Sequence, residues 1–261
     1  MLAHHQQSIA NVTRYFEAQP DVLALLLGGS LAHEFAGPAS DVDVMIVVSD
    51  EVYAERLARG QVHFFNRELC TYPEGYVDGK YLSQGFLEQV RARGSEPARF
   101  AFQDAQVLLA RPDGLPRLLG EIARYPAAEK AERLQRFYAQ FQAWHWYTGE
   151  ALKQHNPYLL SVAVSKLALF GGRLILAHNE RLYPYHKWFL RVLDGAPDRP
   201  AGLCELIEAL TARPSGELAE QLFSLVDGFQ AWPAPPAGWP TQFMVDSELN
   251  WVGGPAPIDD I

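Results

Sequence analysis

Two carboxylates stand at alternate positions where one of the most apolar stretches of the chain begins. Asp41 and Asp43 flank Val42, and the apolar run Val44 to Val48 follows directly. A short apolar run predicts a buried strand, in which alternate side chains project to the same face. Two like charges on one face of a buried strand are costly unless a cation neutralises them. The pattern therefore predicts a divalent cation site, and Mg²⁺ at such a site would leave room for phosphate oxygens.

A glycine turn precedes these carboxylates. The apolar run Val22 to Leu27 predicts a second buried strand, and Gly28, Gly29 and Ser30 follow it. Glycines at a strand end let backbone N–H groups approach a phosphate, and the start of a following helix adds partial positive charge. The Ser30 hydroxyl can donate to the same phosphate. Each motif alone is common in turns and caps, whereas the two together predict a phosphate and metal site.

The combined motif resembles the nucleotidyltransferase superfamily, which includes DNA polymerase beta. In that family Gly-Ser is followed about ten residues later by Ser-Asp-h-Asp-h, where h is apolar; Gly29, Ser30, Asp41 and Asp43 match these positions. The strong part of the resemblance covers residues 22–48. The four residues after Ser30 depart from the pattern of many members, which carry Arg-Gly after Ser-x-Ala, and this leaves the subfamily open. The helical C-terminal half is similar to that of aminoglycoside- and lincosamide-type nucleotidyltransferases.

The resemblance implies a third carboxylate on a neighbouring strand. Asp78 lies in an extended-looking segment, Tyr76 to Tyr81, at a spacing from Asp43 similar to that in the family. Asp104, before the apolar run 105–110, and Glu74, in a turn-like Pro-Glu-Gly, are alternatives. The expected metal ligands and catalytic carboxylates are therefore Asp41, Asp43 and Asp78.

The pattern of elements predicts an α+β chain. We expect an N-terminal nucleotidyltransferase α/β domain with a mixed sheet over residues 1–125 and a helical bundle over residues 126–231. A Pro-rich tail, residues 232–261, is expected to pack on the bundle as an extended strap or to be partly disordered. The expected strands are 22–27, 41–48, 62–65, 76–83 and 105–110; the expected helices include 5–18, 51–58, 86–93, 129–153, 157–177, 203–212 and 218–229.

The helical half offers cations for a triphosphate. The resemblance implies that a lysine of the helical domain contacts the triphosphate, and Lys166, in an otherwise apolar helix, fits that role; Lys153 is a second choice. Lys187 lies in the aromatic and basic segment Tyr183 to Trp188, which can stack a base or line an acceptor pocket. A second aromatic cluster, Trp144 to Tyr147, is expected to serve core packing or acceptor contact.

Charge and composition limit the partners. Lys and Arg number 22 against 31 Asp and Glu, so the net charge is −9, which argues against broad binding of nucleic-acid backbone. The two cysteines form no disulfide framework. With no apolar leader at the N-terminus, the sequence predicts a cytoplasmic protein that does not bind membranes. The expected activity uses two Mg²⁺ ions to transfer a nucleoside monophosphate from a nucleoside triphosphate, ATP or another, to a hydroxyl. The acceptor is left open between an aminoglycoside-like small molecule and a protein partner, and an inactive nucleotide-binding regulator is the third alternative.

Overall fold

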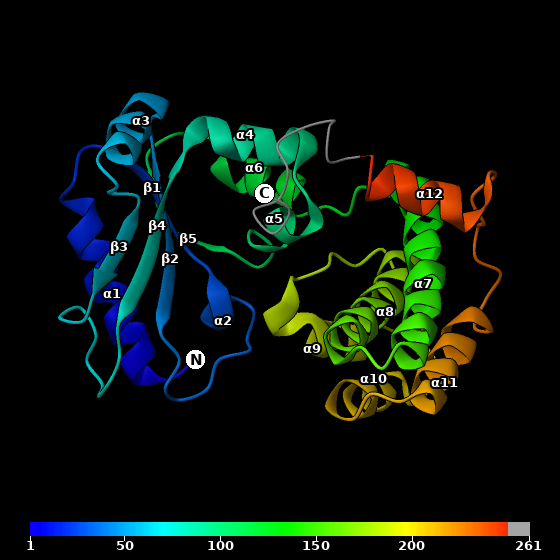
Figure 1. The fold of residues 1–261 in the computed structure, drawn as a ribbon. Coiled ribbons are helices and arrows are strands. Elements are labelled where there is room, and N and C mark those ends of the chain that lie inside the picture. The colour runs from blue at the N-terminus through cyan, green and yellow to red at the C-terminus, as the bar shows by residue number, and fades with distance from the viewer. Residues whose placement is uncertain (250–261) are drawn as a thin grey trace. The chain divides into compact units, whose positions relative to one another are not determined.

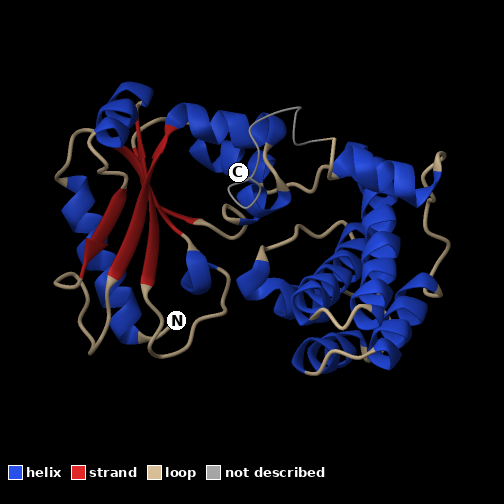
Figure 2. Ribbon diagram, in the orientation of Figure 1, coloured by secondary structure: helices blue, strands red, loops and turns tan. Residues whose placement is uncertain are grey.

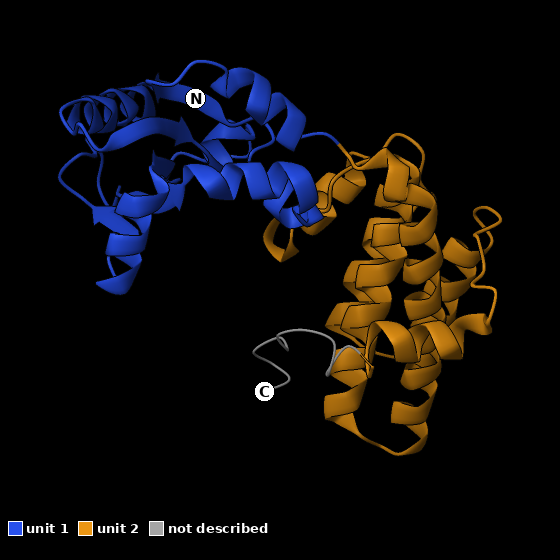
Figure 3. Cartoon of the chain, turned by 90° about the horizontal axis from the view of Figure 1, so that it is seen from above, with its two compact units in different colours: residues 1–124 blue, residues 125–261 orange. Residues whose placement is uncertain are grey.

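The structure is a computed structural model and describes residues 1–249 (Figure 1). The chain forms two compact units that divide between Arg124 and Tyr125 (Figure 3). The boundary expected from the sequence lies after residue 125. Each unit is described by itself.

The first unit is built on a five-stranded mixed sheet of order β3-β4-β2-β1-β5 (Figure 2). The parallel pair is β2 and β4, whereas β1 runs antiparallel to both β2 and β5, and β3 runs antiparallel to β4. The strands are β1 (Val22–Leu27), β2 (Val42–Val48), β3 (His63–Asn66), β4 (Val77–Ser83) and β5 (Gln106–Ala110).

Alternation along the strands gives the sheet two apolar faces. On one face Val44 and Ile46 of β2 pack with residues of α1 (Ala3–Glu17) and α3 (Asp50–Ala58). On the other face Met45 and Val47 pack with α4 (Gln84–Arg93) and α6 (Leu115–Ile122). The sheet is therefore covered by helices on both sides, as the continuous apolar runs of β1 and β2 predict.

Serine side chains cap the starts of three helices in the first unit. Ser49, Ser83 and Ser95 each accept a hydrogen bond from the backbone N–H three residues later, at the starts of α3, α4 and α5 (Glu96–Phe100). A short helix, α2 (Gly29–Ala32), follows β1 directly.

The second unit is helical. Its core gathers Phe141 of α7, Leu174 of α8 and Leu222 of α11 with many neighbours. The helices are α7 (Lys130–Lys153), α8 (Pro157–His178), α9 (Phe189–Asp194), α10 (Leu203–Ala212), α11 (Gly216–Asp227) and α12 (Gly238–Asp246), with short 3₁₀ turns at Ala127–Glu129 and His186–Trp188.

Helix α8 is long and apolar enough, by length and composition, to cross a membrane, with a mean hydropathy of 1.7 over its most apolar window. Half of that window is buried inside the unit, and Leu167, Leu174 and Ile175 lie in the shared core. The core helix of a helical domain passes the same test, so this feature is weak evidence for a membrane span.

Three helices differ from the sequence-based expectation. Helices α5 and α6 were not expected, and both carry proline in their first turn, where it is tolerated. Within the tail, α12 replaces part of the expected extended strap and packs on α7, with Pro240 again in the first turn. The expected disorder at the last residues falls on residues 250–261, which lie outside the described part of the chain.

Candidate active site

Asp43 and Asp78 lie side by side on the sheet. The parallel register of β2 and β4 pairs Asp43 with Asp78, one step after Val42 pairs with Val77. Both carboxylates belong to the face that carries Met45 and Leu82, because side chains alternate along each strand. The helices cover that face further along the strands, and Asp43 and Asp78 remain partly exposed at the strand starts. The strand pairing thus brings together two of the three predicted carboxylates.

The glycine turn lies against Asp43. Since β1 runs antiparallel to β2, the end of β1 meets the start of β2, and the Gly28 N–H donates to the Asp43 carbonyl over 2.9 Å. Gly29 has a φ of +58°, and a Cβ added there would lie 1.7 Å from Oδ2 of Asp43. Only glycine fits at this position.

Ser30 contributes a buried hydroxyl without a partner. The residue is 5% exposed, and its Oγ makes no hydrogen bond to any residue within the described 1–249. Buried polar atoms are nearly always hydrogen-bonded, so such an orphan indicates a missing acceptor or donor. The first N–H groups of α2 lie beside it and have no acceptor within the helix. This cradle of donors fits a phosphate.

The loop before Asp41 is held by two hydrogen bonds. His4, in the first turn of α1, donates from Nε2 to the Pro38 carbonyl over 2.9 Å. The Tyr72 hydroxyl donates to the Ser40 carbonyl over 2.6 Å. Asp41 itself is partly buried immediately before β2. Asp41 therefore follows a loop that hydrogen bonds hold in place.

Tyr76 interacts with all three carboxylates and was not identified from the sequence. Its phenol donates a hydrogen bond to Asp41, and the charge of Asp41, with smaller contributions from Asp78 and Asp43, raises the pKa of Tyr76. The signal was present in the sequence, because Tyr76 stands two residues before Asp78 and so shares its face of the sheet.

Strand β3 adds an aromatic edge to the same face. Phe65 pairs with Asp78 across β3 and β4, and its side chain is 51% exposed. Its ring lies 5.3 Å from the Tyr76 ring, and the Arg67 guanidinium lies within 6 Å of both ring centres. His63 bonds through Nε2 to Oδ1 of Asp78 at 2.7 Å. These side chains were not identified from the sequence because the register of β3 is not readable there.

The two alternative third carboxylates have other neighbours. Asp104 precedes β5, on the opposite side of β1 from β2, and its Oδ2 lies 3.1 Å from Nδ1 of His33. Glu74 lies in an exposed turn, where it pairs with Arg67 at 3.5 Å. Of the three candidates, Asp78 is the one paired in register with Asp43.

The donor set suits Mg²⁺ with a phosphate ligand. Among residues 1–249 no group of three or more His, Cys, Asp or Glu side chains is gathered closely enough to hold a metal ion without further ligands. Mg²⁺ in phosphate-transfer sites is commonly held by one or two carboxylates together with substrate phosphates and waters. The neighbouring carboxylates of Asp43 and Asp78, with the phosphate cradle at Ser30 beside them, match that arrangement.

The two predicted lysines lie in the second unit. Lys166 is exposed on α8, and Lys187 is exposed in the 3₁₀ turn His186–Trp188 with its Nζ 5.0 Å from the Trp188 ring centre. Their contact with a triphosphate stays a prediction.

Comparison with known proteins agrees with the geometry of the first unit. Residues 10–91 match the sequence profile of the nucleotidyltransferase domain. A search of curated proteins finds no match. A solved structure of a nucleotidyltransferase-like protein from Exiguobacterium sibiricum superposes with a TM-score of 0.48 and 10% identity, over 94% of this chain and 77% of that one. The matched segment covers less than half of the chain and contains the glycine turn, Ser30 and all three predicted carboxylates.

Proposed function

We propose that the protein transfers a nucleoside monophosphate from a nucleoside triphosphate to a hydroxyl of a small molecule, with Mg²⁺ as cofactor. The observation that carries this proposal is the register that sets Asp43 beside Asp78, with Gly29 packed against Asp43. A phosphate cradle next to paired carboxylates is what phosphoryl chemistry requires, because catalysis there depends on positioning and charge neutralisation.

Each residue has a distinct role in this proposal. The Ser30 hydroxyl and the first N–H groups of α2 bind the β- and γ-phosphates. Asp41 and Asp43 would hold the Mg²⁺ ion that accompanies the nucleotide, and Asp78 would add a ligand for a second Mg²⁺; when bound, these ions would supply charge neutralisation on the phosphates. Asp78 lies beyond Asp43 toward the edge of the sheet and accepts the proton of the acceptor hydroxyl. Lys166 and Lys187 would add positive charge for the triphosphate.

The aromatic edge supports a small acceptor with rings. Phe65 is exposed directly opposite Asp78, and Tyr76 extends the aromatic surface toward Asp41. Sugar and cyclitol rings present C–H groups to aromatic faces and hydroxyls at their rims, as in aminoglycoside-like compounds. An acceptor seated on Phe65 would thus bring a hydroxyl to Asp78. The net charge of −9 also suits a cationic compound of this class.

The acceptor assay uses the full chain with labelled nucleoside triphosphates, Mg²⁺ and a panel of aminoglycosides, lincosamides and simpler hydroxyl compounds. A labelled small molecule supports the proposal and names the acceptor class. Label that appears only on protein would replace the small molecule with a protein acceptor. Nucleotide binding without transfer to any compound or protein would support an inactive regulator.

Two variants separate nucleotide binding from turnover. Asp43→Asn should weaken Mg²⁺-dependent nucleotide binding and abolish transfer. Asp78→Ala should keep nucleotide affinity near normal and lower turnover by roughly 100-fold or more, since it loses the proton acceptor. Asp104→Ala is the matched control and should change neither quantity strongly. Loss of turnover in Asp104→Ala, with near-normal turnover in Asp78→Ala, would transfer the role to Asp104.

A further inference from the structure

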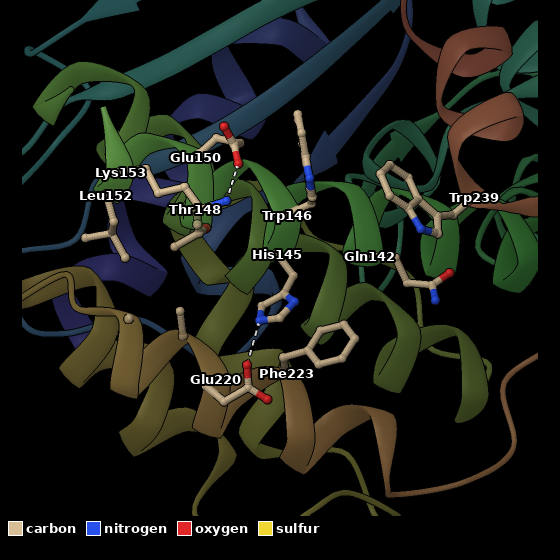
Figure 4. Close-up of a pocket in the computed structure, with 13 residues that line it drawn as sticks. Gln142, His145, Trp146, Thr148, Glu150, Leu152, Lys153, Glu220, Phe223 and Trp239 are labelled. Carbon is tan, nitrogen blue, oxygen red and sulfur yellow. Dashed lines mark hydrogen bonds and ion pairs between the residues drawn. The ribbon is translucent and has the colours of Figure 1, made fainter. Parts of the chain in front are cut away.

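A pocket of about 460 Å³ lies within the second unit and shares no residue with the site proposed above for nucleotidyl transfer (Figure 4). Helices α7 and α11 form its two sides, and Trp239, at the start of α12, closes one end. Its volume falls in the range of small-molecule sites. The side chains that matter below are His145, Trp146, Glu150, Lys153, Glu220 and Trp239.

Small residues keep this space open. The lining positions of α11 include Gly216 and Ala219, which lie on one helix face by their spacing. On α7, Gly149 lies inside a 24-residue helix, where glycine is unfavourable. A Cβ added at Gly149 would meet no atom within 4 Å beyond its own helix and chain neighbours. Close packing therefore does not require this glycine, and a larger side chain there would enter the pocket.

Two indole rings face this space. The ring centres of Trp146 and Trp239 are 6.5 Å apart, with an angle of 41° between the rings. Trp146 is 50% exposed, which is unusual for a side chain of this size. At this separation the two rings are within the range of an aromatic pair, and the exposed Trp146 ring still offers a face to a methylated ammonium group.

Carboxylates outnumber ammonium groups among the residues that line the pocket. Glu220 is held by His145, whose Nε2 lies 3.0 Å from its carboxylate, and His145 stacks on Phe223 with ring centres 4.0 Å apart. Glu150 pairs with Lys153 at 2.7 Å. Among the lining residues there are thus two carboxylates and a single ammonium.

We infer that this pocket binds an organic ammonium ion, with the cationic group against the exposed Trp146 ring, beside Trp239, and the body of the molecule along α7 and α11. Indole rings attract cations through their negative faces, and the excess carboxylate charge favours a cation over a neutral molecule of the same shape. The inference concerns the second unit and does not depend on the acceptor of the proposed transfer reaction.

The test compares two probes on the full chain. Choline carries a quaternary nitrogen, and 3,3-dimethyl-1-butanol has the same shape with a neutral carbon in its place. Each of the six tryptophans gives one indole N–H signal in a ¹H–¹⁵N spectrum, and Trp146→Phe and Trp239→Phe assign the two of interest. Choline should shift both signals and bind about tenfold more tightly than the alcohol. Equal binding of the two probes, or no binding of choline, would overturn the inference.

Pocket variants locate the binding. Gly149→Leu should fill the pocket and abolish choline binding, and Trp146→Ala should weaken it about tenfold. Gly120→Leu is the matched control, because Gly120 also lies in a helix with no atom within 4 Å of an added Cβ, but in the first unit. Choline binding that survives both pocket variants would overturn the site. The Trp146 variant decides the question if Gly149→Leu fails to fold.

Charge variants should move the affinity in opposite directions. Glu220→Gln removes a carboxylate and should weaken choline binding, whereas Lys153→Gln removes the competing ammonium and should strengthen it. Changes in the same direction for both variants would contradict an electrostatic contribution.

Discussion

At the scale of single residues, the close approach of Gly29 to Asp43 is the tightest constraint in the site. Gly29→Ala would place a Cβ 1.7 Å from the Asp43 carboxylate, so that carboxylate must move. We expect nucleotidyl transfer to fall by roughly 100-fold, because displacement of a positioned group by about 1 Å has that effect. Steady-state kinetics with the acceptor identified by the panel measures this loss.

Gly60→Ala is the control for backbone strain. Gly60 has a φ of +70° at the end of α3, and a Cβ there would meet no atom within 4 Å. Both substitutions carry the cost of a left-handed alanine, about 1–2 kcal/mol. The Gly60 variant should therefore lose stability but keep activity. Equal activity losses in the two variants would mean that contact with Asp43 is unimportant.

The hydrogen bond between Tyr76 and Asp41 can be tested by the titration of Tyr76, without any substrate. A neighbouring carboxylate disfavours the phenolate, so the pKa of Tyr76 is raised, with Asp41 as the largest cause. The resulting stabilisation is present below the ordinary pKa of a tyrosine and is lost as pH rises through the raised value. The difference in ultraviolet titration between the protein and Tyr76→Phe isolates this group.

Asp41→Asn should move that titration back toward the ordinary range, whereas Asp104→Asn should leave it in place. A Tyr76 titration unaffected by Asp41→Asn would show that the two side chains are not in contact.

The sequence predicted the site where its signals are local. Gly29, Ser30, Asp41 and Asp43 belong to a compact motif, and pleat alternation predicts which carboxylates share a face. The register between β2 and β4 confirms that Asp78 lies beside Asp43. Phe65 and His63 could not be found, because the pairing of β3 with β4 depends on tertiary structure. The roles of Lys166 and Lys187 remain predictions.

At the scale of elements, a tyrosine on α7 ties that helix to α11. The Tyr138 hydroxyl donates to Oδ1 of Asp227 over 2.6 Å. Burial, together with this hydrogen bond, raises the pKa of Tyr138 to about 12. In the unfolded chain the phenol ionises near pH 10, so the folded state binds more protons between these values. The stabilisation is therefore complete below about pH 10 and is lost as pH rises toward 12.

Tyr138→Phe removes both the hydrogen bond and this pH dependence. We expect a loss of about 1 kcal/mol in the free energy of unfolding at neutral pH. The difference from the unaltered protein should shrink as pH rises above 10, measured by urea unfolding at each pH. A difference that stays constant with pH would exclude the raised pKa of Tyr138.

The elements themselves were predicted best where burial is continuous. Strand β1 was predicted with its exact bounds because the run 22–27 is entirely apolar. Helix α6 was missed although Leu115, Leu119 and Ile122 follow helical spacing; its first turn contains Pro116. The prolines of the tail predicted an extended strap where the structure has α12. Proline is common both in the first turn of a helix and in loops. The two cases cannot be distinguished without knowing which residues pack against the segment.

At the scale of the whole molecule, no apolar core is shared between the units within the described residues. Two clusters lie entirely in the first unit, and the largest lies entirely in the second. Residues 1–124 should therefore fold alone, with a free energy of unfolding of about 5–15 kcal/mol. A single cooperative urea transition of this fragment, at a midpoint also found in the full chain, is the expected result. Gradual, non-cooperative unfolding would show that the first unit depends on the second.

This separation of cores has a consequence during synthesis. Every strand of the sheet and both of its core clusters precede Tyr125, so the nascent chain contains the whole first unit while residues 125–261 are still being made. At about 5–20 residues per second, translation of that remainder takes roughly 7–27 s, longer than most small domains need to fold. The cradle at Ser30 would then meet cellular nucleotide on the ribosome, and nucleotide bound there would stabilise the domain before its helical partner exists.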